Sequence, residues 1–583
     1  MSFKEEIIMK RTNYNGLLTI NDVNKKVTLL GWVARKRNLG SLLFIDLRDK
    51  TGIVQVTVRE GIKVPDIRNE YVIEVNGTIA KKDVPNKLLK TGEIEVIADS
   101  INIINKAETT PLIIDDNTDA LEDTRLKYRY LDLRRPIMLK RLETRAKISK
   151  ATHEYLDANG FLEVETPILT LSTPEGARDY LVPSRLHKGC FYALPQSPQV
   201  YKQLLMIGGV ERYYQIAKCF RDEDLRSDRQ PDFTQIDIET SFLDEDQILT
   251  LNESLLQKIF KDVINYDLKL PLRRIKYSDA LDTYGSDKPD TRFAMHLIDI
   301  KDILKDSDFN VFKENSTVKC IVVNNVAENT SRKVIDELQI EAKKFSLKGY
   351  TVLKFINNKL EGSILKYINE DLQTKLINKL NLVNNDIVII AASNEYKDVC
   401  FGLGALRSMY ANKLNLIKPN TFDLLWVVDF PLFEMSKETG AITSSHHPFT
   451  RPKEDDLPLL DKDPLKVRSA AYDIVINGYE AGGGSLRIYD SEVQKKVFRI
   501  LGLTDEDIKK KFGFFIDAFK YGTPPHGGIA YGLERLTMVL SNTNNIRDVI
   551  AFPKNLAGVC PMSNSPREVD QSQLDELGII IKK

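Results

Sequence analysis

The residues with the clearest potential for chemistry lie in positions 219–242, CFRDEDLRSDRQPDFTQIDIETSF. The first half of this stretch mixes arginines with carboxylates, and the second half alternates polar and apolar residues. Gln235, Asp237 and Glu239 occupy every second position, which predicts a strand with these side chains on one face. Such a face is either a solvated surface with weak ion pairs or a floor that binds a charged, nucleotide-like ligand.

Further candidate residues follow near the C-terminal end. The chain has six histidines, and His446 and His447 are adjacent in the loop SSHHPFT. Asp473 and Glu480 belong to a predicted strand and its end, and the triple glycine at 482–484 would let the backbone approach a neighbour closely. Each pattern also has a structural explanation, because isolated histidines are usually structural and glycine runs form turns and bulges.

The strand at 233–242 needs a partner, and residues 213–217 (YYQIA) predict one just upstream. The two strands would be joined by a charged loop around Arg226 to Pro231. Residues 160–170 (GFLEVETPILT) predict another strand, interrupted by Pro167. Because proline cannot donate to a strand ladder, this strand belongs at a sheet edge or an interface.

The composition bounds the class of protein. A length of 583 residues corresponds to roughly three or four domains of about 150 residues, and 42% hydrophobic content is ordinary for a globular chain. The net charge is zero, so a nucleic-acid partner would be bound by local patches. The five cysteines contain no CxxC pair, which gives no support for a zinc site or a disulfide framework.

The sequence has no apolar run of about 18 residues and no signal-peptide pattern at MSFKEEIIMK. We therefore expect a multidomain cytoplasmic protein with no membrane partner.

Residues 27–98 contain five short strand patterns separated by turn signals. Five strands in this length predict a small closed barrel of the OB type, whose exposed face binds oligonucleotides. The exposed face would carry basic groups that attract phosphates, an aromatic ring that stacks on a base and an amide that reads a base edge. These residues are Arg35, Lys36, Arg37, Phe44 and Gln55. Such barrels also bind proteins or sugars, so this segment alone leaves both alternatives open.

Residues 125–147 contain nine basic and two acidic side chains after a linker rich in proline and aspartate. This run opens a new domain, and it fits either an exposed helix or a surface for a phosphate backbone. Residues 291–417 alternate strand and helix patterns with few catalytic clusters, which predicts an inserted α+β domain.

Three segments resemble motifs 1, 2 and 3 of class II aminoacyl-tRNA synthetases: GFLEVETPILT, FRDE with the following RQPDFTQ, and GIAYGLERL. TPEGARDYLVPSR, QSPQVYKQLL, HHPFT and NGYEAGGGSLRI, with the barrel and the insertion, resemble the bacterial-type aspartyl group of subclass IIb. The resemblance covers essentially the whole chain, and its strength lies in the order and combination of the segments. One departure is Glu534, where the bacterial group commonly has aspartate.

The resemblance implies a multidomain α+β fold with an N-terminal OB-fold β-barrel, an antiparallel class II catalytic sheet of six to seven strands flanked by helices, and an inserted α+β domain. The expected domains are 1–108 (OB-fold, anticodon-binding), 109–135 (hinge or linker), 136–290 (catalytic, motifs 1 and 2), 291–417 (insertion of the GAD type), 418–555 (catalytic, motif 3) and 556–583 (C-terminal extension). Motif 1 implies a homodimer, with Pro167 on a strand beside Glu165 at the interface.

The implied activity is that of an aspartate–tRNA ligase. ATP would activate L-aspartate as aspartyl-adenylate with release of pyrophosphate, and the aspartyl group would then move to the 3′ end of tRNA(Asp). ATP as substrate and Mg²⁺ are the implied cofactors. No general base is needed, because the attacking carboxylate is ionised at pH 7.

Similarity also assigns roles to individual residues. The expected catalytic residues are Arg221, for the α-phosphate and the attacking carboxylate, and Arg535, for the γ-phosphate. The expected aspartate-binding residues are Glu175, Gln199, Lys202, Arg221, Asp237, His446 and Arg487. The expected ATP-binding residues are Arg221, Asp222, Glu223, Gln230, Phe233, Glu480, Gly532, Leu533, Glu534 and Arg535. The expected metal ligands are Asp473 and Glu480, and the expected anticodon readers are Arg37, Phe44 and Gln55. Glu239 is left with a supporting role near the metal.

Several alternatives stay open. Asparaginyl and lysyl enzymes share the barrel and the motifs, although Arg487 with Lys202 favours an anionic substrate. A relaxed enzyme would also charge tRNA(Asn); Leu39, in the loop RNLGS, resembles the discriminating enzymes. A non-catalytic tRNA-binding relative would usually lack the motif arginines and metal carboxylates, which are present here.

Overall fold

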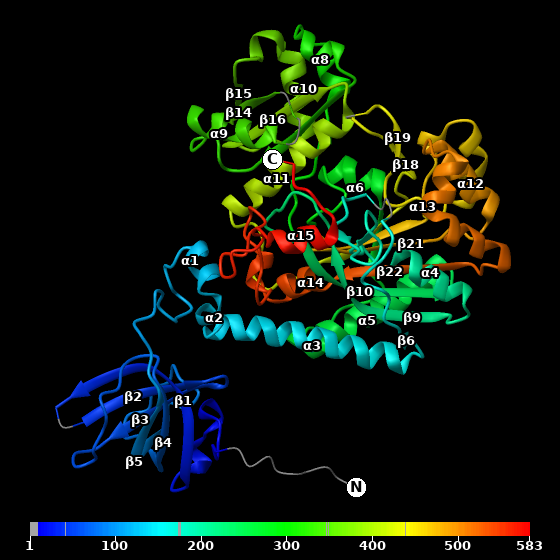
Figure 1. Ribbon diagram of the computed structural model, residues 1–583. Helices are drawn as coiled ribbons and strands as arrows, with labels where there is room; N and C mark the ends of the chain where they lie inside the picture. The colour runs from blue at the N-terminus through cyan, green and yellow to red at the C-terminus, as the bar shows by residue number, and fades with distance from the viewer. Residues whose placement is uncertain are drawn as a thin grey trace. The chain divides into compact units, whose positions relative to one another are not determined.

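The computed structural model describes residues 10–40, 42–172, 176–344, 347, 349–437 and 439–582. Contacts divide the chain into two units, shown as a ribbon in Figure 1. One unit contains Met1–Arg145, Leu225–Ser227 and Asn545–Glu568, and the other contains Ala146–Asp224, Asp228–Asn544 and Val569–Lys583.

A closed five-stranded barrel forms the N-terminal part, in the order β1-β2-β3-β5-β4. Its strands are β1 (Lys26–Leu39), β2 (Leu42–Asp49), β3 (Gly52–Val58), β4 (Val72–Lys81) and β5 (Ile94–Asn105). Alternation along each strand points one set of side chains inward, where Leu29, Val33 and Ile45 are fully buried. The predicted OB barrel is therefore confirmed.

The basic run that follows the barrel forms α1 (Glu122–Lys127), α2 (Arg129–Asp132) and the start of α3 (Pro136–Ala158). Part of this run is buried. Arg129 and Arg135 each donate to Asp132 at 2.7 Å, and Asp132 is fully buried. An exposed helix or a phosphate-binding surface therefore does not account for these two arginines, which are internal ion-pair partners.

An eight-stranded sheet dominates the second unit, in the order β11-β17-β20-β21-β22-β10-β9-β6. The strands are β11 (Arg273–Lys276), β17 (Leu424–Val428), β20 (Ala471–Ile476), β21 (Tyr479–Leu486), β22 (His526–Gly532), β10 (Asp232–Ser241), β9 (Arg212–Phe220) and β6 (Leu162–Glu163). The six central strands pair antiparallel, as predicted, and the two edge strands add parallel pairs. One face packs on α5 (Glu245–Ile264) and α14 (Leu533–Leu540) through Trp426, Tyr472 and Ile238.

The predicted pair of strands around the charged loop is confirmed as β9 and β10. Asp237 pairs in register with Gln215 and Ala530, and Glu239 with Tyr213 and Gly528. Both carboxylates are fully buried. The polar face of β10 is therefore an internal face of the protein, and the solvated-surface explanation does not apply.

The predicted motif 1 strand is shorter than expected. β6 ends at Glu163, and Val164 adds one further backbone bond to the Tyr214 carbonyl. Pro167 follows in irregular backbone, so the prediction that it lies on a strand beside Glu165 is wrong. The edge position is correct, and the lack of an N–H on proline explains why pairing does not resume there.

A separate sheet of five strands forms the insertion, in the order β12-β13-β16-β14-β15. Its strands are β12 (Ile298–Asp299), β13 (Thr317–Val323), β14 (Tyr350–Ile356), β15 (Lys359–Glu361) and β16 (Asp386–Ser393). Its helices are α7 (Lys301–Leu304), α8 (Asn310–Glu314), α9 (Arg332–Lys343), α10 (Glu370–Leu380) and α11 (Tyr396–Lys413). Two apolar clusters involve opposite faces of this sheet.

The other α-helices and strands of the second unit lie outside the two larger sheets. They are α4 (Gln199–Ile207), α6 (Tyr277–Tyr284), α12 (Ser491–Ile500), α13 (Asp505–Ala518), α15 (Gln571–Leu577), β7 (Leu181–Pro183), β8 (Phe191–Ala193), β18 (Phe433–Met435) and β19 (Ile442–Ser444). Among the described residues, no helix is both long and apolar enough to cross a membrane.

The insertion packs on α6 through two glycines, which gives a stability prediction. A Cβ added to Gly404 of α11 would lie 2.2 Å from the backbone oxygen of Gly285. We expect Gly404→Ala to destabilise this contact by about 1–3 kcal/mol, because backbone atoms must separate. Thermal melting should show a lower Tm for Gly404→Ala. Gly513→Ala in α13 is the matched control, since its Cβ has only the Lys509 side chain nearby at 3.8 Å and alanine favours helices. An unchanged Tm for Gly404→Ala would contradict the prediction.

Candidate functional site

Four charged side chains meet on the buried face of β10. Lys202 of α4 donates to Asp237 Oδ1 at 2.6 Å and lies 3.2 Å from Glu239 Oε2. Arg487, which follows β21, donates to Glu239 through Nε at 3.0 Å and through Nη2 at 3.1 Å. All four are at most 2% exposed. We call them the charge network: Lys202, Asp237, Glu239 and Arg487.

The pKa values of the two carboxylates in the charge network shift in opposite directions. Burial alone would raise the pKa of Glu239, but the charges of Arg487 and Lys202 outweigh it and lower this pKa to about 2. For Asp237, burial dominates and raises the pKa against the attraction of Lys202. Glu239 is therefore an ionised anchor for both cations. This role differs from the predicted support of a metal site.

His447 holds Arg487 from the other side. Arg487 Nη1 lies 2.8 Å from His447 Nε2, and because arginine has only donors, Nε2 must accept. Nδ1 lies 3.2 Å from the Phe449 backbone nitrogen and 3.3 Å from the Thr450 hydroxyl. Burial and then the charge of Arg487 lower the pKa of His447 well below its ordinary value, so the ring is neutral. The sequence prediction chose only His446; the adjacent histidines in HHPFT were the signal that could have included His447.

Hydrogen-bonding groups remain free around the charge network. Lysine has three N–H donors and arginine five. Within the described residues, the contacts above and a bond to Ser485 Oγ at 2.6 Å leave one N–H on Lys202 and one on Arg487. Asp237 Oδ2 and Gln199 Nε2 are also buried without a hydrogen-bond partner in this part of the chain. Donor groups on Lys202, Arg487 and Gln199 and one carboxylate oxygen of Asp237 therefore remain, within the described residues, for a ligand that carries both charges.

Arg221 and Phe233 face each other from the two strands of the hairpin. The Arg221 guanidinium carbon lies 5.2 Å from the centre of the Phe233 ring, and its buried Nε has no hydrogen-bond partner among the described residues. This distance is within the range of a cation–π contact, and an aromatic ring can also receive a nucleotide base.

The loop between these strands has its own contacts. Arg229 donates to Glu223 at 2.9 Å, and the Arg178 side chain lies 3.7 Å from Asp222. Gln230 is 4% exposed. The residues predicted to bind a nucleotide therefore cluster at the base of the loop.

The predicted helix of motif 3 is confirmed as α14, with Gly532 as its N-cap and Leu533 buried as its first residue. Glu534 accepts the Thr234 N–H at 2.9 Å, so its carboxylate supports the backbone of β10. Arg535 donates to the backbone oxygen of Glu480 and lies 3.4 Å from Asp228. Asp228, in the loop between β9 and β10, is thus a partner of Arg535.

Asp473 and Glu480 approach each other over Gly483. A Cβ on Gly483 would lie 2.6 Å from Asp473 Oδ1, so glycine leaves space for this carboxylate, whereas Glu480 Oε1, at 3.8 Å, is at an ordinary contact distance. Burial raises the pKa of Asp473 to about 6, although the nearby His446 ring opposes this shift. His446 Nε2 lies 3.8 Å from Asp473 Oδ1.

This pair of carboxylates fits a particular type of metal site. In the described part of the chain, no group of three or more histidine, cysteine, aspartate or glutamate residues could hold a metal ion alone. Mg²⁺, however, often takes only one or two carboxylates and completes its shell with phosphates and water. The donor set therefore fits Mg²⁺ brought in with a phosphate ligand.

On the barrel, the three predicted anticodon readers lie on neighbouring strands. Arg37 and Phe44 are direct partners in the β1–β2 register. Arg37 donates to Asp46 at 3.0 Å, and Gln55 Nε2 lies 3.3 Å from Glu95 Oε2. Lys36, which was predicted to share this face, instead donates to the Ile67 carbonyl at 3.0 Å.

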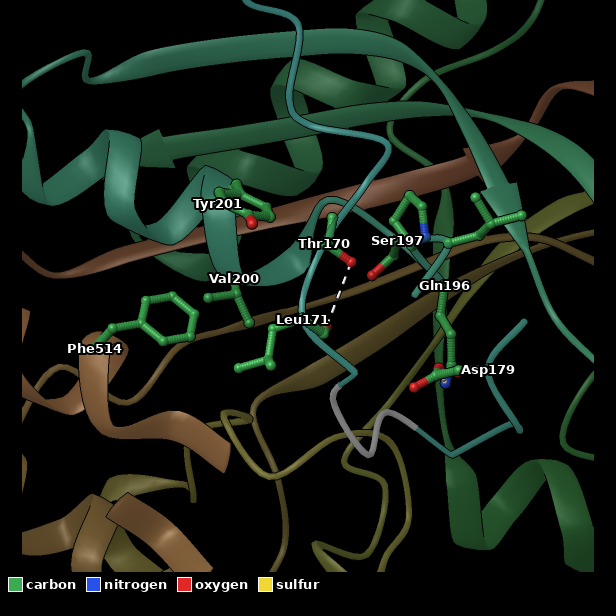
Figure 2. Close-up of a pocket in the computed structure, with 10 residues that line it drawn as sticks. Thr170, Leu171, Asp179, Gln196, Ser197, Val200, Tyr201 and Phe514 are labelled. Carbon is green, nitrogen blue, oxygen red and sulfur yellow. Dashed lines mark hydrogen bonds between the residues drawn. The ribbon is translucent and has the colours of Figure 1, made fainter. Parts of the chain in front are cut away.

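A pocket lies beside the start of α4, and none of the four residues of the charge network lines it (Figure 2). Val200, Tyr201 and Phe514 form one side, and on the other the Gln196 amide donates to Asp179 at 2.5 Å and to the Ala177 carbonyl at 2.8 Å. Gln196 thereby ties the chain after the TPEG segment to the start of α4. Glu175, the remaining predicted aspartate ligand, lies outside the described residues.

The electrostatics of Glu239 predict a pH-dependent stability. Its pKa falls from an ordinary 4.5 to about 2, so its contribution is complete above pH 4.5 and disappears as the pH falls towards 2. Glu239→Gln should lose about 3 kcal/mol at pH 7, and the difference from wild type should narrow at pH 4 and below. Melting curves at several pH values measure this difference. Glu314→Gln, at an exposed position, is the control. A difference that grows with acidification would contradict the assignment.

Comparisons with known proteins place this site in a family. Residues 27–104 match the OB-fold nucleic acid binding domain, and residues 121–556 match tRNA synthetases class II (D, K and N). A protein of Geobacillus sp. (strain WCH70), named aspartate–tRNA(Asp/Asn) ligase, is 50% identical over 583 residues. One from Clostridium botulinum (strain Loch Maree / Type A3), named aspartate–tRNA ligase, is 49% identical over 582 residues. Both matches cover 98% of this chain and 98% of the relative.

Solved structures share the fold at low identity. Asparaginyl-tRNA synthetase from Pyrococcus horikoshii, complexed with asparaginyl-adenylate, matches with a TM-score of 0.57 and 19% identity, covering 91% of this chain and 95% of that one. Aspartyl-tRNA synthetase from Entamoeba histolytica matches with a TM-score of 0.56 and 19% identity. The match covers 92% of this chain and 90% of that one. The family matches confirm what the three sequence motifs indicated: the chain belongs to the class II tRNA synthetases of the D, K and N group and is an aminoacyl-tRNA synthetase.

Proposed function

We propose that the protein is an aspartate–tRNA ligase, which forms aspartyl-adenylate from L-aspartate and ATP and transfers the aspartyl group to tRNA(Asp). The observation that carries this proposal is the pair of N–H groups left on Lys202 and Arg487 beside the unpartnered oxygen of Asp237. The names of the relatives at 50% and 49% identity support it.

The amino acid would be read by complementary charge. Its side-chain carboxylate has two oxygens for the remaining N–H groups of Lys202 and Arg487, and its ammonium has a donor for Asp237 Oδ2. Gln199, Glu175 and His446 would complete the pocket. An asparagine side chain would turn an amide N–H towards one of these donors, and such an unpaired donor costs several kcal/mol in a buried site.

The nucleotide would lie along β9 and β10 towards α14. Phe233 would stack on adenine, with Asp222, Glu223 and Gln230 around the nucleotide. Arg221 would fork between the α-phosphate and the attacking carboxylate, and Arg535, at the start of α14 with Gly532, Leu533 and Glu534, would hold the γ-phosphate. Holding both reactants in line can lower a barrier by about 7–11 kcal/mol, and the aspartate α-carboxylate attacks phosphorus without a base.

Asp473 and Glu480 are the residues that would hold Mg²⁺. When bound, such a cation neutralises phosphate charge and orients the leaving pyrophosphate. The space over Gly483 and the raised pKa of Asp473, which burial and the Glu480 charge cause, support a cation there.

The tRNA would meet the barrel through Arg37, Phe44 and Gln55. We expect Gln55→Ala to weaken tRNA binding by about 1–3 kcal/mol, because a base-edge contact is lost, while aspartate-dependent ATP–pyrophosphate exchange stays at the wild-type rate. Filter binding and exchange assays measure the two effects, with Asn102→Ala on β5 as control. Equal loss of both activities would argue against separate modules.

We further propose a cytoplasmic homodimer, since aminoacyl-tRNA is consumed by translation there. Apolar side chains in and after motif 1 are about half exposed, namely Leu162, Ile168, Leu169 and Leu171, and exposed apolar patches commonly mark interfaces. Light scattering at micromolar concentration should give a mass near twice 66.4 kDa. A monomer at that concentration would contradict the dimer.

A relaxed enzyme that also charges tRNA(Asn) is the second candidate. The Geobacillus relative is named for both tRNAs and the Clostridium relative for aspartate–tRNA alone, whereas Leu39 favours strict recognition. Aminoacylation of purified tRNA(Asp) and tRNA(Asn), side by side, separates the two candidates.

Arg487→Lys tests the amino-acid site. Lysine keeps a positive charge beside Glu239 but lacks the fork that holds Glu239, His447 and a ligand at once. The kcat/KM for aspartate in ATP–pyrophosphate exchange should therefore fall by roughly 10²-fold or more, with Tm within a few degrees of wild type. Arg499→Lys, exposed at the end of α12, is the matched control. Wild-type exchange in Arg487→Lys would overturn the assignment.

A further inference from the structure

Gln494 of α12 is a buried amide beside the histidine loop, the name used here for residues 445–450. Its side chain is fully buried, and its Nε2 donates to the Pro448 carbonyl at 2.8 Å. The other polar atom, Oε1, has no hydrogen-bond partner among the described residues. An apolar side chain would fill the same space without leaving a polar atom unpaired. The contact with Pro448 is therefore the physical reason for an amide at this position.

The histidine loop connects Gln494 to the charge network. Pro448 directly follows His447, and His447 Nε2 lies 2.8 Å from Arg487 Nη1. Because the ring of a proline fixes its φ angle, a hydrogen bond at the Pro448 carbonyl also restrains the backbone that carries His447. The contact from Gln494 thus acts one residue away from the ring that holds Arg487.

An aromatic cluster holds the same loop. Phe449 is fully buried, and its ring centre lies 4.9 Å from that of Phe515 in α13. Val200 of α4, two residues before Lys202, belongs to the same cluster. The helices α12 and α13, which lie side by side in Figure 1, therefore support both cations of the charge network. They support Lys202 through packing on α4, and Arg487 through the histidine loop.

We propose that Gln494 is a positioning residue for the amino-acid substrate: through the histidine loop it keeps His447 against Arg487 and so directs the guanidinium at the side-chain carboxylate. The proposal rests on the proposed function, which assigns that carboxylate to Lys202 and Arg487. A guanidinium presents its N–H groups in a fixed plane, so the direction of the remaining N–H depends on the contacts that orient this plane. ATP is assigned to the β9–β10 hairpin and α14, and the bond from Gln494 goes to neither of them.

Gln494→Met removes the donor to Pro448 with little change in side-chain size. Methionine is unbranched and favours helices, so α12 should stay folded. Lys495→Met is the matched control, because it introduces the same side chain at the next position of the helix and removes a surface ion pair with Glu492, a contact that contributes little. Ile508→Val is a second control, because it removes buried atoms from the aromatic cluster without removing a hydrogen bond.

The experiment measures KM for aspartate and for ATP in ATP–pyrophosphate exchange, with active sites titrated, and the preference for aspartate over asparagine. The apparent affinity of a site follows the population of its competent conformation, which one net hydrogen bond changes about fivefold. We expect Gln494→Met to raise KM for aspartate by about this factor, to leave KM for ATP at the wild-type value and to reduce the preference for aspartate. Both controls should keep wild-type KM values.

An unchanged KM for aspartate in Gln494→Met would overturn the proposal, as would an equal rise in KM for ATP or in either control. A purely structural role would lower Tm and the active fraction and leave both KM values unchanged. If Gln494→Met does not fold, the ratio of KM values in Gln494→Asn decides, because this variant keeps the amide but shortens its reach. Wild-type protein without aspartate-dependent exchange would instead contradict the proposed function, so the two failures are distinguishable.

Discussion

The buried ion pair between Glu239 and Arg487 restricts which residues can occupy the centre of the large sheet. Both groups are buried, and an uncompensated charge there would cost several kcal/mol, so each needs the other. The Glu239 carboxylate also needs space on the neighbouring strand. A Cβ on Gly528 of β22 would lie 2.1 Å from Glu239 Oε2. The Ile238 carbonyl oxygen would lie equally close, so glycine at this position leaves space for both the buried carboxylate and the neighbouring backbone.

Glycines also leave space for neighbouring groups on the adjacent strands. A Cβ on Gly484 of β21 would lie 2.1 Å from the Gly528 carbonyl oxygen, and Gly483 leaves space for the Asp473 carboxylate. Glycine makes the sheet thin where charged groups and ligands must fit. The aromatic and aliphatic face of the sheet, packed on α5 and α14, supplies the rigidity that these glycines lack. The site is thus a polar layer supported by an apolar one.

The local features of the fold could be predicted from the sequence. The alternation of polar and apolar residues predicted the β9–β10 pair and the barrel, and the GIAYGLERL pattern predicted the start of α14. These predictions succeeded because each feature depends on residues close together in the chain. Partners distant in the chain could not be predicted. Arg487 is 248 residues from Glu239, so nothing near Glu239 indicated that it anchors this cation. The internal role of Arg129 was hidden for the same reason, since three of its acceptors are backbone oxygens more than 400 residues away.

The central claim is that the charge network selects an anionic side chain. The direct test compares kcat/KM of the wild-type protein for aspartate and for asparagine in ATP–pyrophosphate exchange. Sites that bind a substrate group through buried polar partners reject analogues by about 10⁴–10⁵. We expect a preference for aspartate of at least roughly 10³ by the same reasoning. Rates for asparagine within tenfold of those for aspartate would contradict the account.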